Sequence, residues 1–570
     1  MTHIFPGQVT FLIIYAIVLL LYALSEFFTW CYSTNVCSLK NAEFKKGLPN
    51  DKKGFASKPS VVVYDDFIPI SVPNDSHLAT PFSSILKENG MVRCLLLRRS
   101  ELIAQRHNLK AMAQFGSLVF WLFLVDRVHL FPHTAKYYNR DLFYFIFSSI
   151  IISGFLSSIQ ISTSSSVILH RSQTEEWKGW MQILFVMYHY FNALEIYSVI
   201  RLCVASYVWM TGYGNFIYYY KHSSFDFNRF LQTMWRLNFL VFFVCLSLGN
   251  RIMLYYICPM HTLFTLLVMA CLMIAPRLNK YSLGIWSKFF ACFLFIFIVW
   301  ENRKVFEAFW WPLHWLVGFS PGDPTKSTLV EWFVRSGFDR YIWIHGMICG
   351  YLHPYASALV NRFETLPIIR RTIIRTAGLT LCFIAGYFYY VNVLSLPRDK
   401  YMKLHPYTSW IPISLWIIVR NCTPTLRERH VRLLGWLGCI TLETYVTQFH
   451  TWMMTNSPDF APVGNLQLLS KKYPLLNFLF TTTVFVGVSW QLFELTVKLK
   501  GVALPSNMDS RILWRNLTLL VMFCSAIYFS VIGVMFMSKQ TSGIGNLVSG
   551  NAPTNTSVSP PTVAGMVGTR

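Results

Sequence analysis

The sequence predicts an all-α protein: a polytopic membrane protein of about 11–13 transmembrane helices around a polar intramembrane cavity. Three observations support this. Of the 570 residues, 54% are hydrophobic and only 13% are charged, a balance too apolar for a soluble protein of this length. The apolar residues gather in runs close to the roughly 20 residues that a membrane-spanning helix needs. One run is crowded with polar side chains, which are costly inside a membrane unless they are paired or face a cavity.

The apolar runs set the order of the expected helices. They begin near Phe11, Ala113, Leu142, Ile183, Leu237, Leu263, Trp286, Ile342, Thr372, Trp410, Leu433, Leu475 and Leu513. The first run lacks the basic segment and the small-residue cleavage site of a signal peptide, so residues 1–30 are expected to remain as a first transmembrane span. Residues 113–538 hold the other runs and predict one multi-spanning membrane domain. Residues 539–570, rich in Gly, Ser, Thr and Pro, predict a disordered tail.

Basic residues indicate how the chain is oriented in the membrane. The net charge is +23, and the connecting loop of residues 31–112 contains 12 Lys or Arg against 7 Asp or Glu. The positive-inside pattern places this basic loop in the cytosol. The amino terminus is then lumenal, and the link around Arg171–Lys178 is cytosolic. Membrane orientation explains the charge, so nucleic acid is not an expected partner.

The polar run extends from Gln173 to Tyr220. On a continuous helix, Lys178, Gln182, Tyr188, His189, Asn192 and Glu195 would fall within an arc of about 140°. Such a stripe of polar side chains inside a membrane is typical of a functional pathway. Ser172 and Glu175 also fit a capping box that opens this helix, which is the structural alternative for Glu175. Arg201 points to a different side and is expected to pair elsewhere.

A second group of polar residues lies at Thr441–Trp452. Glu443, Thr447 and His450 are spaced i, i+4, i+7 and would share a helix face, where a carboxylate could orient an imidazole. Gln448 lies off that face. The alternative is a hydrogen-bond cluster that joins helices without taking part in chemistry.

Weaker signals add further candidates for the polar cavity. These are His261, His405, Arg335, Asp339 and Arg340. Arg335 and Asp339 are expected to form a structural ion pair. No metal site is expected, because Pro132 interrupts the helical spacing of His129 and His133 and no HExxH sequence occurs.

Several long strings resemble one known family. They are QTEEWKGWMQ, MYHYF, YVWMTGYGNF, YYICPMHTLF, RSGFDRYIW, HPYTSWIP and ITLETYVTQFH, in order over roughly residues 95 to 500. They resemble the multi-spanning acyltransferase family that includes plant reduced wall acetylation proteins, the fungal capsule polysaccharide O-acetyltransferase and the animal sialate O-acetyltransferase. Together with the GQVTFL start, the chain most resembles the plant branch. The resemblance implies O-acetylation of glycans such as cell-wall xylan at the Golgi membrane, with acetyl-CoA as donor and no bound cofactor.

The chain departs from the family pattern in several places. No GDS sequence occurs in these residues, so we expect no lumenal esterase-like domain such as the fungal and animal members carry. Asp126-Arg-Val-His129 spells the DxxH of that domain, and we interpret it as a coincidence. Thr451-Trp452 stands where Ile-Trp is expected, and Glu301-Asn-Arg-Lys304 is more charged than usual. In the plant branch a separate lumenal esterase-like protein is held to complete the transfer, so the partner is either such a protein or the polysaccharide acceptor itself.

Attack on a thioester needs a base, and a neutral imidazole with a pKa near 6.5 suits that role. We expect His189 to be this base, and His450 is the second candidate, with Glu443 orienting its imidazole. Gln182 or Asn192 could donate to the oxyanion, and Glu195 completes the catalytic candidates. The donor-binding candidates, led by basic residues for the coenzyme A phosphates, are Lys178, Arg171, Trp177, Trp180, Arg201 and Asn215. Further cavity candidates are Thr447 and Gln448.

Two other functions stay open at this point. A transporter would carry intact acetyl-CoA to separate lumenal O-acetyltransferases, and its histidines would bind or gate. A scaffold would only organise such enzymes, which would leave the polar stripe unexplained. Membrane lipid is an expected partner, and the oligomeric state is open.

Overall fold

The computed structural model describes residues 5–46, 97–161, 168–222, 227–313, 319–320, 323–327, 329–455, 462–504 and 510–548. The described chain is mostly helical. Its longer helices are α1 (Pro6–Lys46), α5 (Arg106–Asp126), α6 (Arg140–Ser158), α7 (Arg171–Phe191), α8 (Tyr197–Lys221), α9 (Phe227–Leu248), α10 (Ile257–Met273), α11 (Ser282–Glu301), α15 (Ile342–Glu364), α16 (Ile368–Tyr389), α22 (Pro474–Ala503) and α23 (Ser510–Val548). Each predicted apolar run lies in a helix.

Shorter helices connect these. They are α4 (Arg99–Ala104), α12 (Arg303–Trp310), α14 (Leu329–Gly337), α17 (Arg398–Thr408), α18 (Trp410–Arg420), α19 (Pro424–Glu428), α20 (Arg432–Cys439) and α21 (Thr441–Thr447). Helices α4 and α5 begin inside the predicted 31–112 loop, and α1 runs past residue 30. Helix α23 continues past residue 538 into the predicted tail. Residues 47–96 of that loop and 549–570 of that tail lie outside the described residues.

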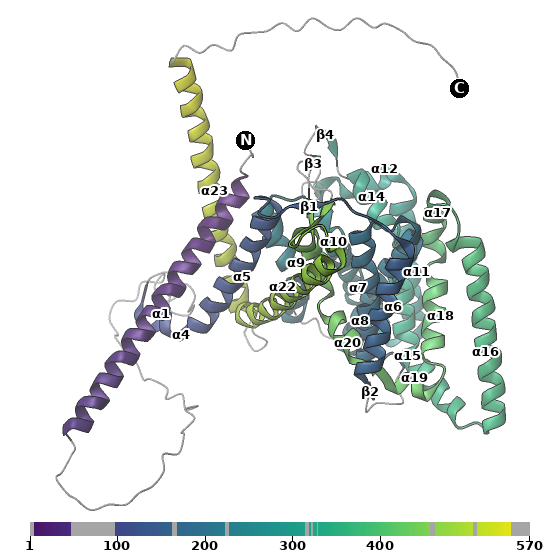
Figure 1. Cartoon of the computed structure of the whole chain (residues 1–570). Coiled ribbons are helices and arrows are strands. Elements are labelled where there is room, and N and C mark those ends of the chain that lie inside the picture. The colour runs from purple at the N-terminus through teal and green to yellow at the C-terminus, as the bar shows by residue number, and fades with distance from the viewer. Residues whose placement is uncertain are drawn as a thin grey trace, which may run out of the picture.

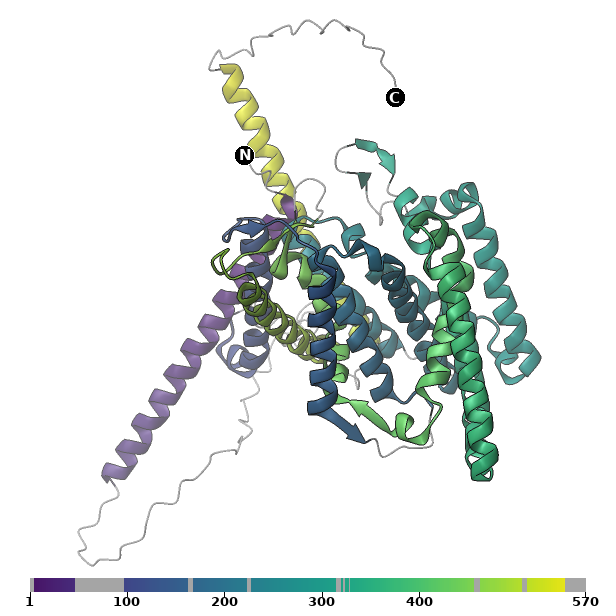
Figure 2. The same cartoon turned by 45° about the vertical axis from the view of Figure 1, so that its right-hand side comes forward.

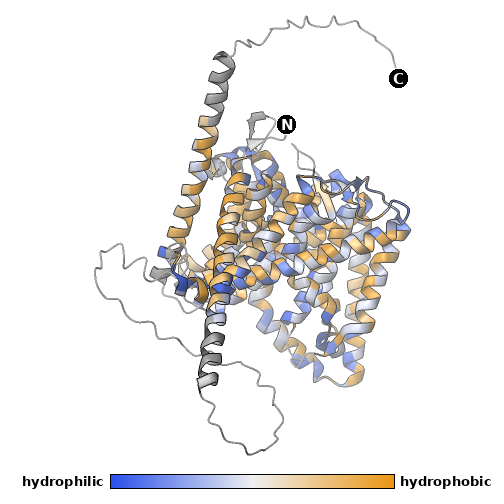
Figure 3. Cartoon of the chain, turned by 60° about the vertical axis from the view of Figure 1, so that its left-hand side comes forward, coloured by the Kyte–Doolittle hydropathy of each residue, from blue (hydrophilic) through white to orange (hydrophobic). Residues whose placement is uncertain are grey.

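Among the described residues, nine helices are long and apolar enough to cross a membrane. Two shorter apolar helices, α10 and α18, have 17 and 11 residues and fall short of the roughly 20 that a span needs. The multi-spanning prediction is thereby confirmed. Hydrophobic residues follow the long helices, and hydrophilic ones gather toward their ends (Figure 3). Figures 1 and 2 place α1 and α16 at opposite sides of the bundle, with α7 and α8 between them.

Glycines allow the central helices to touch backbone to backbone. A Cβ on Gly212 of α8 would lie 2.1 Å from the carbonyl oxygen of Trp343, and one on Gly346 of α15 would lie 2.4 Å from that of Trp209. Helices α7 and α20 meet in the same way, because a Cβ on Gly179 would lie 1.9 Å from the carbonyl oxygen of Leu434. Small residues commonly allow this close approach in membrane bundles.

Short antiparallel strands mark the two ends of the bundle. At one end, which we call the sheet end, β1 (His133–Thr134), β7 (Pro462–Leu466) and β6 (Met453–Thr455) pair in that order, with His133 opposite Leu466 and Met453 opposite Asn465. At the other, which we call the arginine end, β2 (Ile159–Ile161) pairs with β5 (Arg429–Val431). Figure 1 shows β1 and β2 at opposite ends. The third pair, β3 (Phe319–Ser320) with β4 (Asp323–Ser327), is a separate hairpin.

The carboxyl end of α1 and strand β2 lie toward the same end of the molecule in both views (Figures 1 and 2). The predicted cytosolic loop follows α1, and Arg171 follows β2 after a short gap. The two links therefore lie toward the same end of the molecule.

Candidate active site

His450 lies on a π-helical turn, Gln448–Trp452, that continues α21. A wider turn rotates the residues that follow relative to an α-helix, and such turns are frequent at functional sites. The imidazole is fully buried. Its Nδ1 lies 3.0 Å from Asp126 Oδ2, where α5 ends. Asp126 is acceptor-only when ionised, so Nδ1 carries the proton and Nε2 is left as an acceptor.

The Tyr255 hydroxyl donates to that Nε2. Asn250 Nδ2 lies 2.9 Å from the tyrosine oxygen and 3.3 Å from Nε2, and its own Oδ1 accepts from Arg127. On the carboxylate side, Thr455 donates to Asp126 through its backbone nitrogen and its hydroxyl, both at 2.7 Å. Asp126, His450 and Tyr255 therefore form a buried hydrogen-bonded chain whose two ends are held in place. We call it the relay.

An aspartate–histidine pair of this kind can act as a general base, because the carboxylate fixes the tautomer and stabilises the imidazolium that forms. Sequence reasoning anticipated His450 but assigned the wrong carboxylate. Both oxygens of Glu443 instead accept from Arg236, whose NH2 also reaches the carbonyl of Cys439 at 3.1 Å. The prediction that Glu443 orients His450 is wrong, because the π turn moves His450 off its face.

His189 lies near the relay, across one aromatic ring. Phe449 has its ring centroid 5.8 Å from that of His189 and 6.3 Å from those of Tyr255 and His450. The half-buried imidazole of His189 donates from Nδ1 to the Phe185 carbonyl at 3.1 Å, which leaves Nε2 as an acceptor. The structure thus brings together the two histidines that the sequence singled out.

Lys136 lies between β1 and α6, at the sheet end of the bundle, and contacts the residues around His189. Its Nζ donates to the backbone carbonyl of His189 at 2.8 Å and lies 3.2 Å from the sulfur of Met453. Burial lowers the pKa of Lys136 to about 8. A second positive charge on the neighbouring His189 would be repelled, so His189 is suited to stay neutral.

A second buried cluster is built around Asp339. Its carboxylate accepts from Arg201 at 2.6 Å and lies 3.2 Å from His405 Nε2, and His405 Nδ1 is 2.8 Å from the Tyr401 hydroxyl. Arg201 therefore pairs away from the polar stripe, as expected, and is committed to this ion pair rather than to a donor. The expected Arg335–Asp339 pair is wrong: Arg335 lies 3.5 Å from Glu331 and stacks 4.6 Å from the Tyr256 ring centroid.

The two clusters meet at consecutive residues of one string. Tyr255 belongs to the relay, and the Tyr256 hydroxyl accepts from Arg201 at 3.3 Å. The strings that carried the family resemblance therefore supply the polar contacts of the bundle interior: YYICPMHTLF, RSGFDRYIW, HPYTSWIP and ITLETYVTQFH all contribute.

The predicted polar stripe on α7 is only partly present. The helix ends at Phe191, and Asn192 caps it in the left-handed conformation with φ 58°. Asn192 and Glu195 are exposed, so neither joins a stripe. The helix also starts differently from the predicted capping box, because the cap is His170 rather than Ser172. The break explains why α8 was not anticipated as a separate span.

Gln182 serves as a link between helices. Its Nε2 donates to Thr444 Oγ1 at 2.9 Å and to the Thr441 carbonyl at 3.2 Å, and its Oε1 accepts from Tyr207 at 3.1 Å. Both amide hydrogens are used, so the predicted oxyanion role does not fit.

Most remaining candidates also make structural contacts. His261 Nδ1 lies 2.6 Å from Thr211 Oγ1, and Asn215 donates to Thr265 at 3.2 Å. Arg340 donates to Glu301 at 2.6 Å. The Thr447 hydroxyl lies 2.8 Å from that of Ser489, and Gln448 donates to the Tyr445 carbonyl at 3.0 Å. Trp177 and Trp180 pack on Trp416 with centroids 6.1 and 5.4 Å away. Lys178 lies 2.7 Å and Arg171 3.8 Å from Glu175 at the arginine end.

Sequence reasoning missed Asp126, Asn250, Tyr255 and Arg236. Asp126 carried the clearest signal, because a carboxylate in the last turn of an apolar run is costly unless it has a partner. It was passed over as part of a coincidental DxxH. His129 adopts φ 53° in the loop that follows, which still gives no support to an esterase motif.

A multi-spanning helical bundle with a buried Asp–His–Tyr chain defines a class of membrane protein suited to acid–base chemistry within the protein interior. The comparisons identify the family. The model of the "10 TM Acyl Transferase domain found in Cas1p" matches residues 88–518, more than half of the chain, so the protein belongs to this acyltransferase family. The resemblance to a multi-spanning O-acetyltransferase family is confirmed.

A similar protein is the N-acetylneuraminate (7)9-O-acetyltransferase of Danio rerio, 26% identical over 423 residues. The match covers 70% of this chain and 51% of that relative, so the chain spans about half of the relative's length. No solved structure matches.

Proposed function

We propose that the protein is a membrane O-acetyltransferase that moves the acetyl group of acetyl-CoA onto a hydroxyl group, and that the relay is its base. The single observation that carries the proposal is the buried chain Asp126–His450–Tyr255. The family and the relative's O-acetyltransferase name support the reaction class. The sequence strings of the plant branch lead us to place the protein in the Golgi membrane, with a cell-wall polysaccharide such as xylan as acceptor, reached directly or through a lumenal esterase-like partner.

His450 is better suited than His189 to accept a proton. Its imidazolium would face the Asp126 carboxylate at 3.0 Å, whereas protonated His189 would face a backbone carbonyl with Lys136 nearby. A carboxylate within about 4–6 Å favours the charged imidazole, and a neighbouring cation opposes it. This reverses the order expected from the sequence.

In the proposed step, protons move along the relay. The acceptor hydroxyl gives its proton to the Tyr255 oxygen as Tyr255 gives its own to His450 Nε2. The acceptor oxygen forms a bond to the thioester carbonyl carbon, and the carbon–sulfur bond breaks. The coenzyme A thiolate then takes the proton back from the relay. His189, neutral and with Nε2 open as an acceptor, orients the acceptor hydroxyl.

The donor would approach from the arginine end. Arg171 and Lys178 lie there, and the phosphates of coenzyme A are natural partners for such cations. The side chain of Arg171 is 91% exposed, so it can reach a ligand while Glu175 neutralises part of its charge.

The test uses purified full-length protein in sealed liposomes with a xylan oligosaccharide and acetyl-CoA labelled separately on the acetyl group and on coenzyme A. We expect acetyl to appear on the sugar while coenzyme A stays outside. His450→Ala should lower the rate by roughly 10²- to 10⁴-fold, the usual contribution of a general base. His189→Ala should lower it less.

The matched control is His222→Ala, because His222 is an exposed histidine at the end of α8. It should keep the wild-type rate. Entry of both labels without transfer would instead make the protein an acetyl-CoA carrier. An unchanged rate in folded His450→Ala would remove the relay from the mechanism.

A further inference from the structure

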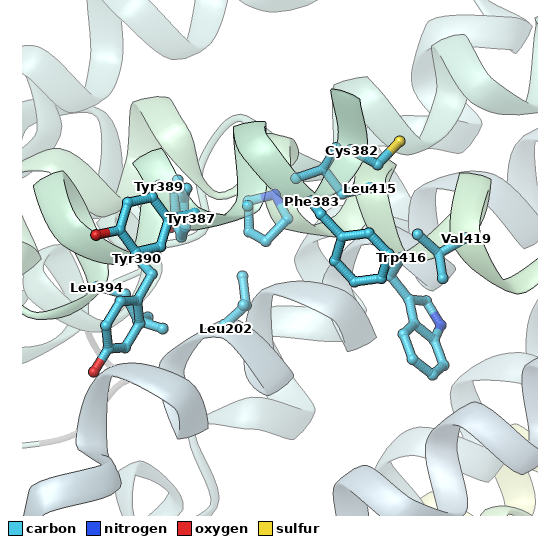
Figure 4. Close-up of a pocket in the computed structure, with 12 residues that line it drawn as sticks. Leu202, Cys382, Phe383, Tyr387, Tyr389, Tyr390, Leu394, Leu415, Trp416 and Val419 are labelled. Atoms are coloured by element: carbon cyan, nitrogen blue, oxygen red, sulfur yellow. The ribbon is translucent and has the colours of Figure 1, made fainter. Parts of the chain in front are cut away.

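An apolar cavity of about 510 Å³ lies between α16 and α18, away from both histidines. It is lined by Leu202 of α8, by Phe383 and Tyr387 of α16 with Leu394 of the π-helical turn that follows, and by Leu415 and Trp416 of α18. Figure 4 shows Cys382 and Val419 toward one end and Tyr390 and Leu394 toward the other. We call this the α16–α18 groove.

The groove lies beside a helix that is exposed on the outside of the bundle. In the span that includes α16, only 6% of the most apolar window is buried, and Figure 1 shows this helix at the outer edge of the bundle. An apolar hollow at this position favours hydrocarbon over water, since water would lose hydrogen bonds there. A hydrocarbon chain fits both the lining and the location.

One end of the groove leads to a cluster of arginines. One face of α16 joins the arginines to the groove. Its residues, spaced by four, seven, four and three positions, are Arg371, Arg375, Cys382, Gly386 and Tyr389. Arg375 is therefore about 10 Å along the helix from the Cys382 end of the groove, at 1.5 Å per residue. On α18, Arg420 directly follows the lining residue Val419.

The arginine cluster has more positive than negative charge. The carboxylate of Glu364 forms ion pairs with three guanidinium groups. The nitrogen–oxygen distances are 3.3 Å to Arg371, 3.3 Å to Arg375 and 2.9 Å to Arg427. Arg420 pairs separately with Glu176 at 3.2 Å. The Nε–H groups of Arg371, Arg375 and Arg427 are buried and find no hydrogen-bond partner among the described residues. Buried donors on cations normally have partners, so the cluster is incomplete without an anion.

We propose that this surface binds an anionic glycerophospholipid, with its phosphate on Arg371, Arg375 and Arg427 and one acyl chain in the α16–α18 groove. A zwitterionic lipid adds no net negative charge to a cluster that already has excess positive charge, whereas an anionic lipid does. The arm of coenzyme A contains amide groups, which this apolar lining could not satisfy. Basic pockets at the ends of membrane helices commonly bind lipid head groups in this way.

The experiment uses the full-length protein in lipid nanodiscs with phosphatidylserine that carries a photoreactive diazirine on one acyl chain. Phosphatidylcholine with the same chain serves as the reference, and labelled peptides are mapped by mass spectrometry. We expect labelling of the α16 and α18 segments to be at least about fivefold stronger with phosphatidylserine, the factor that a single basic residue contributing roughly 1 kcal/mol would give.

Paired variants test the two parts of the surface. Arg371→Gln with Arg375→Gln should reduce phosphatidylserine labelling to the phosphatidylcholine level. Its matched control is Arg362→Gln with Arg370→Gln, which removes the same charge from exposed positions at the same end and should keep the preference. Gly386→Trp should block labelling by both lipids, because a Cβ there would lie 3.9 Å from Leu415 Cδ1.

Three results would overturn the proposal. One is equal labelling by the two lipids. Another is an equal effect of the control pair, which would mean that only general surface charge matters. The third is loss of the label when acetyl-CoA is added, which would assign the arginine cluster to the donor. None of these results bears on the relay, so the proposed reaction is tested independently.

Discussion

A buried carboxylate decides the chemistry of His450. Asp126 and His450 are both fully buried, and Asp126 uses both oxygens: one on the Thr455 backbone and the other on the imidazole and the Thr455 hydroxyl. A buried charge is retained only where partners of this kind compensate its desolvation. The pair is therefore a built arrangement rather than a chance contact.

Asp126→Asn tests that arrangement at the level of one atom. The amide keeps the shape but cannot stabilise an imidazolium, so we expect the transfer rate to fall by about 10²- to 10⁴-fold. The measurement compares the acetyl-transfer rates of Asp126→Asn, of His450→Ala and of the double variant that carries both changes. Since the two residues act as one unit, the double variant should be no slower than His450→Ala alone. Additive losses would mean that they act independently.

At the scale of the element, the helix pair α9 and α21 is held by Arg236 and Glu443. The carboxylate is fully buried and the guanidinium is 29% exposed. Arg236 also stacks 5.1 Å from the centroid of Phe493 on α22. This ion pair joins three helices behind the relay and takes no part in it.

Glu443→Gln separates stability from catalysis. Leaving the guanidinium without its carboxylate should lower the free energy of unfolding by about 1–3 kcal/mol, measured by thermal unfolding in detergent. The transfer rate per folded molecule should stay within a few-fold of wild type. A loss as large as that of Asp126→Asn, with unchanged stability, would restore Glu443 to the catalytic machinery.

At the scale of the whole molecule, the two ends of the bundle have different tasks. The relay, His189 and Lys136 are associated with the strands of the sheet end, and Arg171 and Lys178, the proposed contacts for the donor, lie at the other. Under the proposed function, donor phosphates and acceptor hydroxyls meet the protein at opposite ends of the bundle.

Cysteine labelling tests this orientation. In a background without native cysteines, Arg171→Cys should react with an impermeant maleimide added to the cytosolic side of sealed membrane vesicles. Tyr137→Cys, at a 72% exposed position beside β1, should react only after the membrane is permeabilised. The reverse pattern would invert the topology. Equal reaction at both positions would show leaky vesicles, and a lumenal marker enzyme serves as the control for sealing.

Much of the fold could be predicted because apolar runs of membrane-spanning length are a local property of the chain. Each predicted run, from the one at Phe11 to the one at Leu513, lies in a helix. The division of Gln173–Tyr220 into α7 and α8 was not visible, since Asn192 ends a helix only through its left-handed backbone. Periodicity across that break placed Asn192 and Glu195 on a face that does not exist.

The sequence by itself determined the membrane class, the order of the helices and the two histidines near the centre of the site, because hydropathy and the cost of buried polar groups act along the chain. Only the tertiary structure decided the partners. Asp126 and His450 are 324 positions apart, and Arg201 and Asp339 are 138 apart. No local pattern joins residues so distant; helix packing brings Asp126 to His450 and gives Glu443 to Arg236.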